Sequence, residues 1–156
     1  MKYEVAENCM TCHGLAHPGL KADDLAKMLG AGHPINPGFE LVKYSQGSVR
    51  HRHYPPDIKT NAEMTPQELA QIYLVGQAAA LVSATEVISK SSEAKYKEAQ
   101  SKRVEIAKSA LGGVSEAAGL LAAPTRENAI KFVQSIAGKD LTSAVGSKLP
   151  AKSDYK

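Results

Sequence analysis

Residues 65–88 read TPQELAQIYLVGQAAALVSATEVI, and their pattern predicts the fold class. Thr65 and Glu68 have the spacing of a capping box, and Pro66 stands at the first helical position, so a helix is expected to begin here. Across 69–88, apolar residues occupy nearly every face of that helix, which predicts a central and buried position. The stretch therefore predicts a mainly α-helical protein built around one buried helix.

The helical pattern continues beyond this stretch to about Leu111. Residues 92–111 are amphipathic, with apolar side chains alternating with lysines. Residues 90–93 fit either a break or a kink. As one rod of about 45 residues the helix would span about 70 Å, which is long for a monomeric domain, so we expect a helical hairpin or a dimer. Shorter helices are expected over 115–123 and 126–137.

A second informative stretch lies near the start of the chain, where residues 9–13 read CMTCH. This is the C-x-x-C-H signature of c-type haem attachment. The spacing lets Cys9 and Cys12 form thioether bonds with neighbouring vinyl groups, and His13 can then bind the iron from the proximal side. Both cysteines of the chain lie in this motif. We therefore expect one covalent haem c per chain.

Three other interpretations of the cysteine pair are weaker. A thioredoxin-like redox pair needs a preceding strand and a βαβ unit, which the short segment before Cys9 does not supply. A zinc site would need two of the histidines His33, His51 and His53, and the close pair has poor spacing for zinc. A disulfide between Cys9 and Cys12 would close a very small, strained loop.

Residues 30–64 form the least regular part of the chain, with four glycines, four prolines and three of the five histidines. A loop of this length in a compact domain is usually functional or disordered, and we expect an ordered wrap that covers the haem. Within it, residues 39–44 have some strand character and fit a wrapped loop equally well. Before it, we expect a helical turn over 9–16 and a short helix over 22–29, with residues 1–8 as a short leader.

The second axial ligand of the iron is expected from this irregular segment. His51 and His33 are nearly equal candidates, followed by His53 and then Met64. Gly32 and Pro34 flank His33 and would let the backbone approach a flat ring. Two arginines flank His51 and can bind the haem propionates bidentately: Arg50 and Arg52. Of two further candidates, His17 is expected at the surface and Met28 in the core.

Residues 32–51 read GHPINPGFELVKYSQGSVRH. This run resembles a segment of bacterial multihaem c-type cytochromes of the cytochrome c554 and hydroxylamine-oxidoreductase-associated group, in which a GH…FELVxWSQGxVRH run follows a haem motif. The helical YVVG segment of that group corresponds to residues 72–76. The resemblance covers about residues 9–85 and implies extracytoplasmic electron transfer, with His33 and His51 as the matching histidines. This chain differs in having a single C-x-x-C-H.

Composition narrows the classes of partner. The net charge of +3 is mild, and no basic–aromatic pattern indicates nucleic-acid binding. Polar residues interrupt the longest apolar run, so no membrane span is expected. The first residues lack a signal-peptide pattern, which indicates a mature or trimmed chain, because haem attachment to this motif takes place outside the cytoplasm in bacteria. The expected partner is a redox protein, and a homodimer remains an alternative to a monomer.

The sequence therefore predicts a monohaem c-type cytochrome in the periplasm or otherwise outside the cytoplasm. It would transfer electrons through a bis-histidine haem, as an electron carrier rather than an enzyme. The alternative is a haem-based sensor or gas-binding protein with a weak or empty sixth site. We expect one compact unit in which 1–64 bind the haem, 65–138 form a helical bundle packed on that region, and 139–156 form a polar tail.

Overall fold

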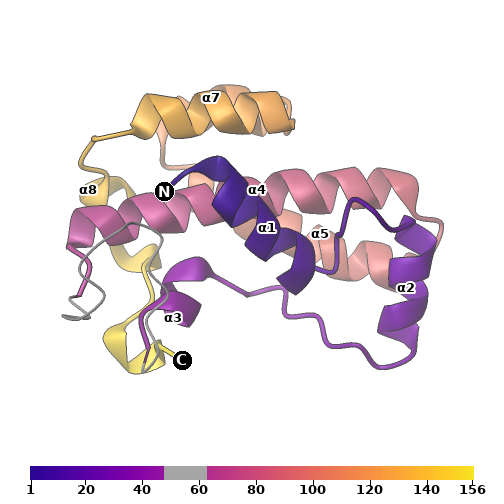
Figure 1. Cartoon of the computed structure of the whole chain (residues 1–156). Coiled ribbons are helices and arrows are strands. Elements are labelled where there is room, and N and C mark those ends of the chain that lie inside the picture. The colour runs from indigo at the N-terminus through magenta and orange to yellow at the C-terminus, as the bar shows by residue number, and fades with distance from the viewer. Residues whose placement is uncertain (48–62) are drawn as a thin grey trace.

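A computed structural model of the chain describes residues 1–47 and 63–156. Within these ranges the chain forms eight α-helices and three short 3-10 helices, and no β-strand (Figure 1). The predicted mainly α-helical fold class is therefore confirmed. The α-helices are α1 (Tyr3–His13), α2 (Ala22–Gly30), α3 (Leu41–Ser45), α4 (Pro66–Lys90), α5 (Ala94–Leu111), α6 (Ala118–Ala122), α7 (Arg126–Ile136) and α8 (Thr142–Val145). The 3-10 helices are Ser115–Ala117, Gly146–Lys148 and Lys152–Asp154.

Helix α4 is the central element, and it begins as predicted. The Thr65 hydroxyl accepts a hydrogen bond from the backbone N–H of Glu68, and the Glu68 carboxylate accepts one from the Thr65 N–H at 2.7 Å. By length and composition α4 could cross a membrane, because an 18-residue window of it has a mean hydropathy of 1.4. However, 78% of that window is buried inside the protein. The helices α1, α5, α7 and α8 supply much of that cover.

Helices α4 and α5 form an antiparallel hairpin, which selects the predicted break over the continuous rod (Figure 1). The corner between them is held by Asp23 of α2. Its carboxylate accepts hydrogen bonds from the Ser91 hydroxyl at 2.9 Å, from the Ser92 N–H at 2.9 Å and from the Ser92 hydroxyl at 3.2 Å. The end of α4 is therefore fixed by a residue that is distant in the sequence.

The apolar side chains form a main core around α4 and a smaller second cluster. In the main core, α1 contributes Tyr3, Ala6 and Met10. The second cluster lies where α2 meets the hairpin corner and contains the following buried residues: Leu15, Ala16, Ala22, Leu25, Ala26, Val87 and Tyr96. The two clusters hold α1 from both ends, since its first two turns pack into one and the chain that follows it packs into the other.

Two segments differ from the sequence-based expectation near the start of the irregular region. Helix α1 begins at Tyr3, so most of the expected leader is helical. Residues 41–45 form the short helix α3 instead of a strand or a loop. The buried Glu40 side chain caps α3 by accepting hydrogen bonds from the N–H groups of Val42 at 2.7 Å and Lys43 at 2.9 Å. Burial raises the pKa of the Glu40 carboxyl.

The segment expected as a polar tail also packs on the body of the protein. Leu141, which precedes α8, and Val145, its last residue, lie in the main core. The backbone N–H of Lys156 donates to the carbonyl of Lys43 in α3 at 2.9 Å. The segment 139–156 therefore contributes to the same folded unit as α3 and α4.

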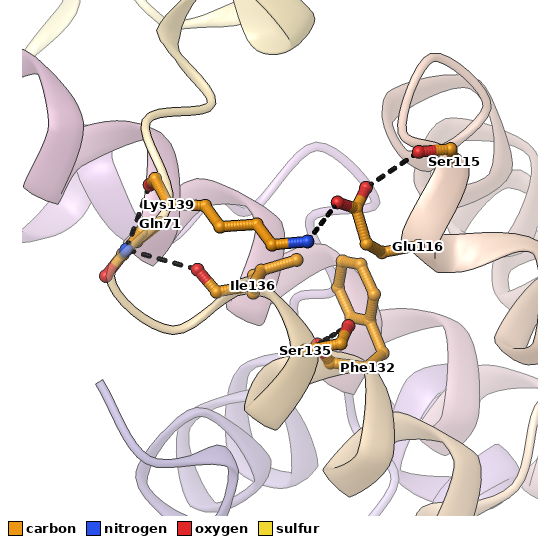
Figure 2. Close-up of polar contacts among 7 residues, drawn as sticks. All are labelled: Gln71, Ser115, Glu116, Phe132, Ser135, Ile136 and Lys139. Atoms are coloured by element: carbon orange, nitrogen blue, oxygen red, sulfur yellow. Dashed lines mark hydrogen bonds and ion pairs between the residues drawn. The ribbon is translucent and has the colours of Figure 1, made fainter.

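A polar corner fixes the end of α7 against α4 (Figure 2). The Gln71 amide donates to the carbonyls of Ile136 at 3.3 Å and Lys139 at 3.2 Å. The Lys139 ammonium contacts the Glu116 carboxylate at 2.6 Å, and the Ser115 hydroxyl donates to the same carboxylate at 3.0 Å. The hydrogen bond from Lys139 lowers the pKa of Glu116 to about 2.

Candidate functional site

The C-x-x-C-H motif occupies the last turn and a half of α1. Because residues three and four apart on a helix are neighbours, Cys9 shares one face with Cys12 and His13. Cys9 is half-buried against the main core, whereas Cys12 and His13 are exposed. Both thiols are free. The motif is therefore presented at the open end of a helix whose other face, through Met10, is anchored in the core.

The protonation of Cys9 bears on the alternative of a thiol redox site. Burial and the neighbouring Cys12 raise the pKa of the Cys9 thiol. Reactive redox cysteines have a lowered pKa, because the thiolate is the nucleophile. The environment of Cys9 thus lacks the activation that a thioredoxin-like pair requires.

An open hollow lies beside the exposed end of the motif. It measures about 220 Å³, and it is lined by Cys12, His13, His33, Pro34, Asn36, Phe39 and Tyr44. The His13 ring stacks on Phe39, with centroids 4.0 Å apart and planes inclined by 10°. Phe39 in turn tilts against Tyr44 at 4.8 Å. The structure therefore brings His33, a predicted axial ligand, to the same hollow as His13.

Two other candidates, Met64 and His17, border cavities separate from this hollow. Arg50, Arg52, His51 and His53 lie outside the described residues. Met64 borders a separate small cavity, and the Gln46 amide donates to its sulfur at 3.4 Å. His17 borders another hollow together with Tyr3, Glu7 and Glu86. Among the predicted ligands in the described part of the chain, His33 is thus the one that shares a hollow with His13.

Arg103 of α5 is buried directly behind the motif, with 3% of its surface exposed. Its guanidinium donates to the carbonyls of Met10 at 3.3 Å and Gly14 at 3.1 Å. It also donates to the Gln100 amide oxygen at 2.7 Å and to the Ser83 hydroxyl at 3.1 Å. These four acceptors are neutral oxygen atoms. Burial lowers the pKa of Arg103 to about 10, which leaves the side chain charged at neutral pH.

The chain turns sharply just after His13, and α5 holds that turn. Leu15 adopts a φ of 49°, in the left-handed region that bulky residues rarely occupy. Its carbonyl accepts a hydrogen bond from the Tyr96 hydroxyl at 2.5 Å. The Gln100 amide donates to the Gly14 carbonyl at 2.9 Å. Side chains of α5 thus bind carbonyls that the end of α1 leaves without helical partners.

Sequence reasoning missed this group behind the motif. Residues 92–111 have the composition of a solvated, lysine-rich helix, and nothing in that pattern distinguishes Arg103 from an exposed cation. The spacing of three polar side chains nevertheless indicates that Arg103 is buried. Tyr96, Gln100 and Arg103 follow one another at spacings of four and three, so they share a helix face with the apolar residue Ala107. Polar side chains on a core-facing stripe indicate a buried hydrogen-bonding role.

The residues present fit a haem in their donor chemistry. Exposed Cys12 and half-buried Cys9 supply two thiols, and His13 and His33 supply two imidazoles beside one aromatic hollow. A haem iron takes axial protein ligands and needs no larger cluster. Pockets that enclose a ligand usually measure about 300–1,000 Å³, so a group attached at this smaller hollow would stand partly in solvent.

A zinc site finds no such fit in the described residues, which contain no group of three His, Cys, Asp or Glu side chains placed to hold a metal ion. A larger cavity, of about 550 Å³, lies between the start of α1, α4 and α7, but neither cysteine nor histidine lines it. Comparison with family models, with curated proteins and with solved structures finds no match to this chain.

Proposed function

We propose that the chain is a monohaem c-type cytochrome that transfers electrons outside the cytoplasm to and from a redox partner protein. The observation that carries the proposal is the arrangement of the motif. Cys9, Cys12 and His13 share one face of a helix, at its exposed end, beside a hollow that His33 also borders. Such a face offers two thiols and an imidazole to one planar group.

In this proposal each residue has a separate role. Cys9 and Cys12 would hold the haem through two thioether bonds, and the His13 imidazole would bind its iron. The group supplies a one-electron centre when bound. Phe39 and Tyr44 offer aromatic surface to it and exclude water from that side. The protein otherwise contributes orientation and electrostatics rather than substrate chemistry, which favours an electron carrier over an enzyme.

His33 is the second axial ligand that we propose from the described part of the chain, and His51 is the alternative. The absorption spectrum of the holo protein tests both. Replacing the true ligand by alanine converts a low-spin spectrum to a high-spin one, whereas His17→Ala, at an exposed histidine outside the hollow, leaves the spectrum unchanged. If neither His33→Ala nor His51→Ala changes the spin state, bis-histidine ligation by these residues is refuted.

A sensor or gas-binding protein is the competing function. His33 is exposed on the loop between α2 and α3, so solvent or a small gas molecule can reach this side of the site. Carbon monoxide separates the two functions. A ferrous wild-type spectrum that is unchanged by carbon monoxide supports the six-coordinate carrier, and a rapid spectral shift supports the sensor and refutes the carrier.

A further inference from the structure

A buried positive charge stands against the backbone of the attachment motif. The Arg103 guanidinium contacts the carbonyl of Met10, which lies between the two cysteines, and that of Gly14, which follows His13. We infer that Arg103 is a positioning residue of the site: it fixes the end of α1 that carries Cys12 and His13, and its charge favours the reduced state of the attached group. This inference rests on the proposed function.

The positioning role follows from the shape of the guanidinium. Its two terminal nitrogens reach two carbonyls that are four residues apart, one helical turn, at the C-terminal end of α1, which carries partial negative charge. The Met10 carbonyl also accepts the backbone N–H of Gly14, whereas the Gly14 carbonyl lies beyond the last turn. A lysine ammonium carries its three donors on one nitrogen atom and cannot reproduce this planar fork. The approach is so close that a Cβ at Gly14 would overlap the guanidinium. The direction in which His13 leaves α1 is thereby fixed.

The electrostatic role follows from the neutral partners of Arg103. Among the described residues its hydrogen-bond acceptors are two carbonyls, an amide oxygen and a hydroxyl, so no carboxylate among them neutralises its charge. In general, a unit charge on the order of 10 Å from a one-electron centre shifts the ratio of reduced to oxidised forms by about tenfold or somewhat more at an effective dielectric constant of about 20. The electron comes from the proposed redox partner, and the step needs no bond change or proton transfer.

The charge can be cancelled without removing the fork. Ser83 accepts a hydrogen bond from Arg103 and is itself buried, so Ser83→Asp places a carboxylate against the guanidinium. Ser83→Asn is the matched neutral control. In the holo protein at a fixed applied potential, we expect Ser83→Asp to lower the reduced-to-oxidised ratio about tenfold relative to Ser83→Asn. The yield of covalent haem per chain should be the same in both.

The fork is tested separately by Arg103→Lys, which keeps the charge. We expect a reduced-to-oxidised ratio within about twofold of wild type, because the charge stays buried, but a several-fold lower yield of covalent haem, because the end of α1 is no longer fixed. Lys95→Gln, at an exposed position on the same helix, should change neither quantity, since solvent and salt screen its charge.

The outcomes separate this inference from the proposed function. A wild-type chain without covalent haem refutes both. With haem present, equal ratios in Ser83→Asp and Ser83→Asn refute the electrostatic role alone. A wild-type haem yield in Arg103→Lys refutes the positioning role alone. If Ser83→Asp does not fold, Arg103→Gln replaces it, and an unchanged ratio there refutes the electrostatic role.

Discussion

Replacing Gly14 by alanine should destabilise the chain by about 3 kcal/mol. The backbone at Gly14 has φ −91° and ψ 0°, which any residue can adopt, so conformational strain is not the cause. The added Cβ would instead overlap the Arg103 guanidinium and the Met10 carbonyl. Arg103 can relieve its own overlap only by withdrawing from the carbonyls that it binds, and the overlap with the Met10 carbonyl requires a shift of the backbone at the end of α1.

The magnitude combines two contributions that partly overlap. Forcing extra atoms into a packed interior costs about 1–3 kcal/mol. A hydrogen bond from a charged group is worth about 1.5–3 kcal/mol, and Arg103 loses at least one. A total of about 3 kcal/mol lowers the melting temperature of a chain of this length by about 6–12 °C.

Urea and thermal unfolding, followed by far-UV circular dichroism, measure this loss. The matched control is Gly30→Ala at the end of α2, where an added Cβ meets nothing within 4 Å. That variant should be as stable as wild type or more stable by up to about 1 kcal/mol, because alanine is the better helix former. If Gly14→Ala stays within about 0.5 kcal/mol of wild type, the close packing of Arg103 against the motif is refuted.

Three further predictions concern the frame of the site. The hydrogen bond from the Ser92 N–H holds the pKa of the Asp23 carboxyl below its ordinary value of 3.8. In urea unfolding, wild type should therefore be more stable than Asp23→Asn above pH 3.8, and this difference should disappear as the pH falls through the lowered pKa. Lys139 lowers the pKa of Glu116 from 4.5 to about 2. Wild type should therefore unfold at higher urea than Glu116→Gln at pH 7, and this difference in stability should disappear as the pH falls from 4.5 to about 2. Gly76→Ala would place a Cβ 3.0 Å from the Leu41 side chain. Overpacking of about 1–3 kcal/mol outweighs the gain in helix propensity, so urea unfolding should show a net loss of about 1 kcal/mol in stability. A variant more stable than wild type contradicts that packing.

The central helix could be predicted because its signals are local. The capping box at Thr65 and the apolar run behind it are readable within a few residues. The hairpin could not be chosen over a rod in the same way, because Asp23, which holds the corner at residues 91 and 92, is distant in the sequence. Helix α3 is similar, since its short sequence fits several conformations and the Glu40 side chain decides among them.

The candidate site likewise combines residues that a local sequence pattern predicts with residues that only tertiary contacts bring into place. The spacing of Cys9, Cys12 and His13 carries its chemistry in five residues. His33 reaches the hollow because of the path of the loop after α2. The sequence alone does not predict this path, so it could not rank His33 against the other histidines. Arg103 was hidden because burial of a polar side chain is decided by its partners, which here lie on α1 and α4.

The proposed function depends on covalent haem attachment, which the mass of the denatured chain reveals. The chain is to be produced in a bacterial periplasm with c-type maturation, extracted with acid and acetone, and weighed intact by mass spectrometry. We expect wild type to exceed the mass of its sequence by one haem, and the Cys9→Ala, Cys12→Ala double variant to have the mass of its sequence alone. A wild-type chain with the mass of the sequence alone would contradict this expectation.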